Sequence, residues 1–152
     1  MYFLGIDPGT SGAIALLDET VVSCLSFFDK DVIIDMLDFL SHEQVKTKCC
    51  LEQVHAMPKQ GTVSMFHFGE NFGWLQGVLD MAGIEYTLVP PQKWKKEFKL
   101  SQDKEESIAL AKKLFPRVDL APGKRRVDND NLAEALLMAE YARRIKQSVL
   151  EN

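Results

Sequence analysis

Apolar residues along the first 28 positions fall into three short runs, each closed by turn-forming or acidic residues. Runs bounded in this way are typical of strands, so strands are predicted over 2–6, 12–17 and 21–28. Because the connections between them are short, the three strands should form an antiparallel meander. The pattern then changes to a helical spacing, with acidic residues between the apolar ones, and predicts a helix over 29–40.

The middle of the chain alternates between strands and helices. Strands are predicted over 48–54 and 84–89, and a pair of prolines ends the second of them. A loop over 55–63 and a helix over 66–81 lie between these strands. Helices that connect strands imply parallel crossover connections, so the two later strands are expected to run parallel in the sheet.

The last third of the chain is predicted to be helical. A D-x-x-E sequence at 103–106 matches a capping box and starts a helix that runs to residue 115, before a proline. A basic loop follows over 117–127, and the clearest helical pattern of the chain covers 129–147. The order of elements predicts a mixed α/β fold. The length of 152 residues predicts a single domain over 1–152, because domains typically hold about 100–150 residues.

Charge is distributed unevenly along the chain. The net charge is −4, but residues 86–126 carry eleven basic and five acidic side chains, whereas residues 1–58 carry three basic and nine acidic ones. Nearby cations set the local potential, so a basic region can bind nucleic-acid phosphates in a protein of negative net charge. The alternative is a lysine-rich helical surface that is only solvated.

Other features predict a cytoplasmic protein without a membrane partner. No apolar run approaches the length of about 20 residues that a membrane span needs. The first residues, MYFLGIDPG, lack the basic start and cleavage site of a secretory signal peptide. The three cysteines, two of them adjacent, are interpreted as reduced core residues.

Four acidic residues stand where a carboxylate is unusual. Asp7 closes the first predicted strand, and Glu52 lies inside an apolar strand, where an unpaired carboxylate is costly. Asp130 and Glu134 are four residues apart and share one face of the last predicted helix. Hard cations such as Mg²⁺ prefer oxygen ligands of this kind, and two such ions can clamp a scissile phosphate. The alternative is a separate structural role for each carboxylate, such as a favourable place at a helix start.

Three motifs together resemble the RuvC-type Holliday junction resolvases, in particular their phage-encoded branch. They are GIDPGTSG at 5–12, LEQVHAMPKQG at 51–61 and DNLAEALLMAEYARR at 130–144. The first motif alone is shared with actin-like ATPases, whereas the three in this order and spacing are specific. The resemblance covers nearly the whole chain. It implies an RNase H-like fold, in which a five-stranded mixed sheet of three antiparallel and then two parallel strands is flanked by helices.

The resemblance also implies which residues form the catalytic site. The family's two final aspartates, three residues apart, correspond here to Asn131 and Glu134, so Asp130 is predicted to replace the first of them in preference to Asp128. Mg²⁺ is the implied cofactor in a two-metal site, with Mn²⁺ as a substitute. The predicted catalytic and metal-binding carboxylates are Asp7, Glu52, Asp130 and Glu134.

Basic residues complete the implied site. Lys95 and Lys104 fall on the positions of the family's catalytic-site lysines, where a positive charge would stabilise the transition state. His55 stands where bacterial members carry an aromatic wedge, and Phe66 or Phe68 could take that role if they do not pack in the core. Trp94 is interpreted as a core anchor, with stacking on DNA as the alternative. The predicted DNA-binding residues are His55, Lys59, Lys93, Lys96, Lys99, Lys124, Arg125 and Arg126.

The predicted function is therefore metal-dependent endonuclease activity on branched DNA. A homodimer would resolve four-way (Holliday) junctions by paired hydrolysis that leaves 5′-phosphate and 3′-hydroxyl ends, because a symmetric substrate needs a symmetric enzyme. The helix over 66–81 is the candidate dimer face. The alternatives are a nuclease with a broader range of forks, flaps and three-way junctions, and a non-catalytic junction-binding module. An actin-like ATP-binding domain would require a second lobe, for which the chain is too short.

Overall fold

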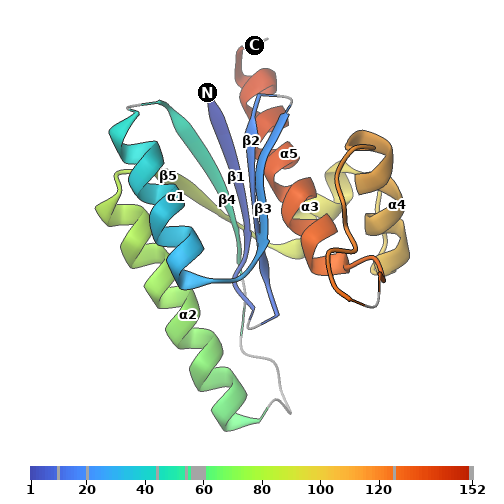
Figure 1. Cartoon of the computed structure of the whole chain (residues 1–152), viewed down its shortest axis with the longest axis horizontal. Coiled ribbons are helices and arrows are strands. Elements are labelled where there is room, and N and C mark those ends of the chain that lie inside the picture. Colours follow the sequence, from blue (N-terminus) through green and yellow to red (C-terminus); the bar gives the residue numbers. More distant parts are fainter. Residues whose placement is uncertain are drawn as a thin grey trace.

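A five-stranded mixed sheet lies between two layers of helices (Figure 1). The computed structural model describes residues 1–9, 11–19, 21–43, 45–53, 55, 61–124 and 126–150, with the side chains of 146–150 excepted. The strands are β1 (Tyr2–Asp7), β2 (Ala13–Asp18), β3 (Val21–Phe27), β4 (Thr47–Glu52) and β5 (Glu85–Val89). The helices are α1 (Lys30–His42), α2 (Thr62–Met81), α3 (Pro91–Glu97), α4 (Lys104–Leu114) and α5 (Asp130–Leu150).

The sheet has the strand order β3-β2-β1-β4-β5, with β1 at its centre. β1 and β2 are antiparallel, as are β2 and β3, whereas β4 is parallel to β1 and β5 is parallel to β4. This arrangement confirms the predicted three antiparallel and two parallel strands. Ile6 of β1 lies beside Leu51 of β4, so the next residue of each strand, Asp7 and Glu52, reaches the same edge of the sheet.

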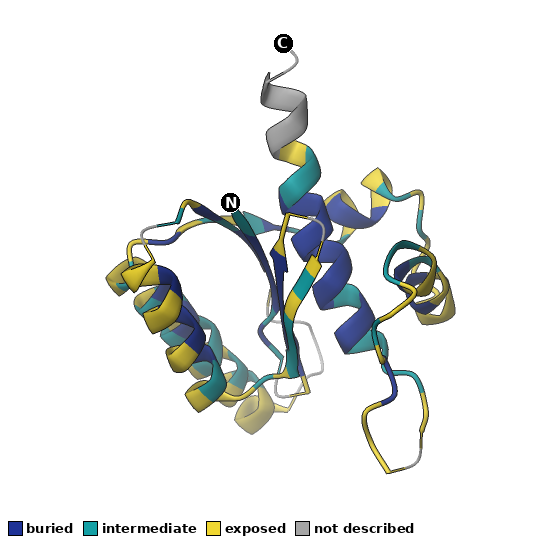
Figure 2. Cartoon of the chain, turned by 45° about the horizontal axis from the view of Figure 1, so that its top comes forward, coloured by how far each residue is buried: buried dark blue, intermediate teal, exposed yellow. Residues whose placement is uncertain are grey.

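The two faces of the sheet are covered by different helices. α1 and α2 lie on one face, and α3, α4 and α5 lie on the other (Figure 1). Side chains alternate along a strand, so Leu4 and Ile6 of β1 pack toward α1 and α2, whereas Phe3 packs toward α5. The first half of α5 is buried, while α1 and α2 expose their outer surfaces (Figure 2).

Gly5 allows α5 to pack directly on the centre of β1. A Cβ atom at this position would lie 2.2 Å from the carbonyl oxygen of Ala135 and 2.4 Å from the backbone nitrogen of Ala139. No side chain fits such a space, because real Cβ atoms do not approach backbone atoms so closely. The close approach places the first turns of α5 beside the end of β1, where Asp7 lies.

Two helices differ from the sequence prediction. α2 begins at Thr62 rather than at 66, and only Leu75 and Leu79 of this helix are buried, so its apolar residues give no clear periodic start. α3 is missed altogether, because the proline pair at 90–91 indicates only the end of a strand. Proline also fits the first turn of a helix, where its missing N–H group is not needed, and Pro91 is the first residue of α3.

The bounds of the other elements agree with the predictions to within three residues. Val54, the last residue of the strand predicted over 48–54, and residues 56–60 of the predicted loop lie outside the described residues. Among the described residues, none of the helices combines the length and apolar composition that crossing a membrane requires.

Candidate active site

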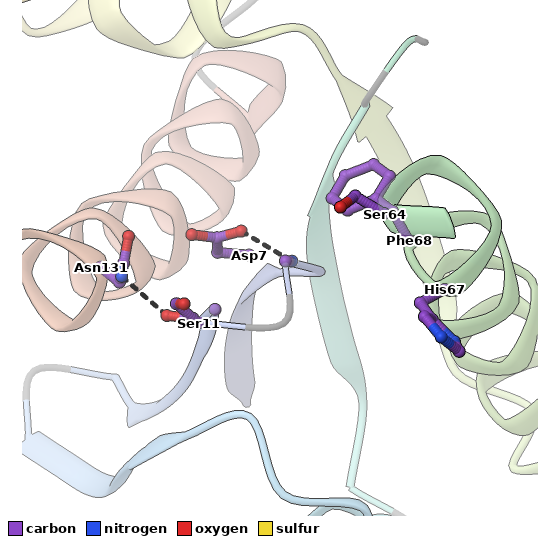
Figure 3. A pocket seen from close by; sticks show the side chains of 8 residues that line it. Asp7, Ser11, Ser64, His67, Phe68 and Asn131 are labelled. Atoms are coloured by element: carbon purple, nitrogen blue, oxygen red, sulfur yellow. Dashed lines mark hydrogen bonds between the residues drawn. The ribbon is translucent and has the colours of Figure 1, made fainter. Parts of the chain in front are cut away.

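Asp7 ends β1 in a tight turn that holds its carboxylate. The backbone N–H of Gly9 donates a hydrogen bond to Asp7 Oδ1 (3.0 Å) (Figure 3), and a Cβ at Gly12 would lie 2.1 Å from the Asp7 carbonyl oxygen. Burial raises the pKa of Asp7, opposed by the Gly9 N–H, and the carboxylates of Glu134 and Asp130 raise it further. The turn therefore fixes an acidic group in a place that disfavours its negative charge.

Glu52 is the last residue of β4, next to Asp7, and a residue of α3 holds its carboxylate. The indole Nε1–H of Trp94 donates a hydrogen bond to Glu52 Oε2 (3.0 Å). Burial raises the pKa of Glu52 to about 7, against the lowering effect of that hydrogen bond, and the charges of Asp7 and Glu134 add to the rise. Two partly buried carboxylates on adjacent parallel strands thus repel each other.

The start of α5 supplies the other two carboxylates. The side chain of Asn129 accepts a hydrogen bond from the backbone of the first turn (3.1 Å), which is the usual way in which a helix is capped. Asp130 and Glu134 then lie on the first turns, close enough to Asp7 for their charges to act on it. Asn131 Nδ2 donates to the carbonyl oxygen of Ser11 (2.7 Å) (Figure 3), so the helix start is tied to the turn that follows β1.

Asp128 lies outside this group of carboxylates. It forms an ion pair with Lys112 of α4 and is not among the charges that affect the pKa of Asp7, whereas Asp130 is. Asp130 thus interacts with the carboxylate of Asp7, and its role as a metal ligand in preference to Asp128 stays a prediction.

Two lysines enter the site from α3 and α4. Lys95 Nζ lies 2.7 Å from Glu134 Oε1, and the Lys95 side chain is only 8% exposed. Ser107 Oγ, also buried, donates to the same oxygen (3.3 Å). Lys104 forms an ion pair with Asp130, and its pKa is raised by that hydrogen bond. Both lysines predicted to be catalytic therefore meet the carboxylates.

The four carboxylates are the kind of ligand that a hard divalent cation takes, although their side chains do not surround a common point. In the described part of the chain, no group of three or more His, Cys, Asp or Glu side chains is placed to hold a metal ion as it stands. Two of the four carboxylates are instead engaged by lysine ammonium groups. Carboxylate oxygens are the ligands that Mg²⁺ prefers, and a cation would relieve the repulsion that helps raise the pKa of Asp7 and Glu52.

The other predicted DNA-binding residues are exposed wherever the structure describes them. Lys93 and Lys96 are exposed on α3, the helix that delivers Lys95, and Lys99 is exposed just after it. Lys124 is also exposed, and Arg126 is exposed but paired with Asp119 (3.0 Å). His55 is exposed after β4. Lys59 and Arg125 lie outside the described residues.

A cleft of about 400 Å³ opens beside Asp7 (Figure 3). Asp7 lines it together with the turn after β1 and Asn131, and the first turns of α2 face them with Ser64, His67 and Phe68. The Phe66 side chain is 65% exposed, so it does not pack in the core.

Ser64 and His67 were not expected at the site. The sequence prediction ends the loop at 63 and starts the helix at 66, which leaves Ser64 outside both and gives no reason to align it with His67. The signal that could have placed them is their spacing of three, which puts two residues on one face once the helix begins at Thr62.

The strand order and the helices on both faces of the sheet form the mixed five-stranded, RNase H-like fold that was predicted. Two solved structures of Thermus thermophilus RuvC are similar to the chain. The one in complex with a Holliday junction substrate has a TM-score of 0.61 and 17% identity, covering 97% of this chain and 96% of that one. The other has a TM-score of 0.61 and 15% identity, covering 97% of each chain. No protein-family model and no curated protein matches the sequence. The similarity confirms the predicted fold.

Proposed function

We propose that this chain is a divalent-metal-dependent DNA endonuclease that resolves four-way junctions. The observation that carries the proposal is the meeting of Asp7, Glu52, Asp130 and Glu134 at one edge of the sheet, where Lys95 and Lys104 also arrive. One of the two similar structures is a complex with a Holliday junction substrate, which supports branched DNA as the partner. We place this activity in the cytoplasm.

The four carboxylates would hold Mg²⁺, or Mn²⁺ in its place. When bound, the metal would supply an activated water and stabilise charge on the phosphate and on the leaving oxygen. Lys95 and Lys104 lie where a positive charge can act on the same phosphate. The lysines of α3, Lys93 and Lys96, point away from the core and are free to contact flanking phosphates. Hydrolysis in this site would leave a 5′-phosphate and a 3′-hydroxyl end.

Cleavage of two opposed strands requires two sites, and we propose that α2 forms the dimer face. Gly69, Gly73 and Gly77 are exposed along this helix, and a Cβ atom at each would meet nothing within 4 Å. Each glycine inside a helix costs about 1 kcal/mol relative to alanine. A stripe of glycines lets a second helix approach closely, and Phe66, which is 65% exposed, would gain cover in such a contact.

Replacing Gly73 with Gln is expected to give a folded monomer. The substitution adds a good helix former to an exposed position, so the monomer should keep its fold, while the larger side chain prevents close approach of a second α2 helix. Sedimentation velocity at micromolar concentration measures the oligomeric state, and the matched control is Asp35→Gln on the exposed face of α1. A monomeric parent, or a Gly73→Gln variant that is as dimeric as the parent, would contradict the assignment of α2.

Cleavage of a labelled immobile four-way junction tests the proposal, with a matched fork and a linear duplex beside it. We expect paired symmetric nicks on the junction in Mg²⁺, and complete loss of cleavage in EDTA. Cutting of forks and three-way junctions at similar rates would instead indicate a broader debranching nuclease. Tight binding of the junction without any cutting, in Mg²⁺ and in Mn²⁺, would contradict the nuclease and leave a binding module.

A further inference from the structure

Two consecutive residues of α3 hold carboxylates that come from two different elements. Trp94 is fully buried and donates its indole N–H to Glu52 of β4 (3.0 Å). Lys95 contacts Glu134 of α5 (2.7 Å). One short helix therefore fixes the position of both acidic groups.

The path of the chain explains why Trp94 reaches Glu52. Val89, the last residue of β5, is paired in register with Glu52, and the N–H of Gln53 donates to the Val89 carbonyl oxygen (2.9 Å). α3 begins at Pro91, two residues later, so its first turns lie directly beside the end of β4. The indole ring packs in the core between the sheet and α5, which gives it no freedom to turn away.

We infer that Trp94 is a positioning residue of the carboxylate site, holding Glu52 Oε2 so that Oε1 is presented to a metal ion. This inference rests on the proposed metal-dependent function. The indole N–H can only donate a hydrogen bond and never accepts one, so its partner at this position is always a carboxylate oxygen of Glu52. Because the indole carries no charge, it orients the Glu52 carboxylate without neutralising it, so the carboxylate keeps its attraction for a cation. Lys95 differs in this respect, since its ammonium group neutralises the carboxylate that it holds.

The tryptophan content makes this role measurable. The chain has two tryptophans, and the second, Trp74, lies in α2 on the opposite face of the sheet, beside Phe28 and Lys30. A Trp74→Phe variant therefore has Trp94 as its one indole group. In this variant, Ca²⁺ is titrated while the emission of Trp94 is followed, and calorimetry gives the Ca²⁺ affinity independently. We expect the emission to change and saturate at the affinity found by calorimetry, and the change to disappear when Glu52→Gln is added.

A Trp94→Phe variant tests the role from the other side. Phenylalanine keeps most of the packing and removes the N–H donor. Loss of groups that orient metal ligands typically weakens metal affinity about 10–100-fold, so Ca²⁺ should bind at least about tenfold more weakly than to the parent. Trp74→Phe, the matched control, should bind Ca²⁺ with the affinity of the parent.

The outcomes separate this inference from the proposed function. Parental Ca²⁺ affinity in Trp94→Phe, with only a lower melting temperature, would show that Trp94 is a packing residue and would overturn the inference alone. An emission of Trp94 that ignores bound Ca²⁺ would overturn it as well, and this measurement decides if Trp94→Phe does not fold. A parent protein that binds no divalent metal would overturn the metal site and the inference together.

Discussion

Replacing Asp7 with Asn should slow junction cleavage about a thousandfold, a loss of several kcal/mol of transition-state stabilisation, while junction binding stays within a few fold. Asn has the shape of Asp, and its side-chain oxygen can still accept the hydrogen bond that Gly9 donates to Oδ1. The change removes one of the four charges that would bind the metal. Single-turnover cleavage and gel-shift binding on the same junction measure the two effects.

The stability of the Asp7→Asn variant should change in the opposite direction to its cleavage rate. Burial and neighbouring carboxylates raise the pKa of Asp7, so at neutral pH the ionised group is held where its charge is disfavoured. Asn removes that charge, and the melting temperature without metal should be equal to or above that of the parent. Asp18→Asn, at the exposed end of β2, is the matched control and should cleave normally. Cleavage by Asp7→Asn within tenfold of the parent would contradict the catalytic assignment.

Replacing Lys95 with Met should lower the free energy of unfolding by about 3 kcal/mol and abolish cleavage, because breaking a buried ion pair leaves an uncompensated charge. The Lys95 side chain is 8% exposed and that of Glu134 is 13% exposed, so water cannot replace the lost partner fully. Met matches the length of the lysine stem. Urea denaturation measures the loss of stability, and the same junction assay measures the loss of cleavage.

Two further measurements separate the stability of the pair from its catalytic role. Adding Glu134→Gln to Lys95→Met should recover most of the stability, because the unpaired charge is gone, but should not recover cleavage. Mg²⁺ should also stabilise Lys95→Met more than the parent, since a cation supplies the charge that the variant lacks. Lys96→Met, on the exposed side of the same helix, should change stability by less than about 0.5 kcal/mol. Equal losses in Lys95→Met and Lys96→Met would contradict the structural role of the pair.

The sequence by itself determined the order of the five strands, their relative directions and four of the five helices, all except α3. The apolar runs of the first three strands, each closed by turn residues, leave little choice but a meander, and the helices between later strands impose parallel connections. The same patterning located Asp7 at the end of the first strand, but it placed Glu52 inside its strand, which the structure ends at this residue. The spacing of Asp130 and Glu134 placed both on one face of α5. These features are local in the chain, so periodicity and turn chemistry are enough to predict them.

The tertiary structure alone decided which groups meet these carboxylates. No local pattern indicates that Trp94 hydrogen-bonds with Glu52, 42 residues away, or that Lys95 is buried against Glu134 instead of lying on a solvated surface. α3 itself is absent from the prediction, because a proline pair is compatible both with the end of a strand and with the start of a helix. The cleft between α2 and the β1 turn likewise depends on how α2 packs against the sheet. Long-range contacts of this kind follow from how whole elements pack on one another. That packing depends on the shapes of the two hydrophobic cores, one on each face of the sheet. It also depends on Gly5, the position in β1 where α5 can approach the strand without a side chain between them.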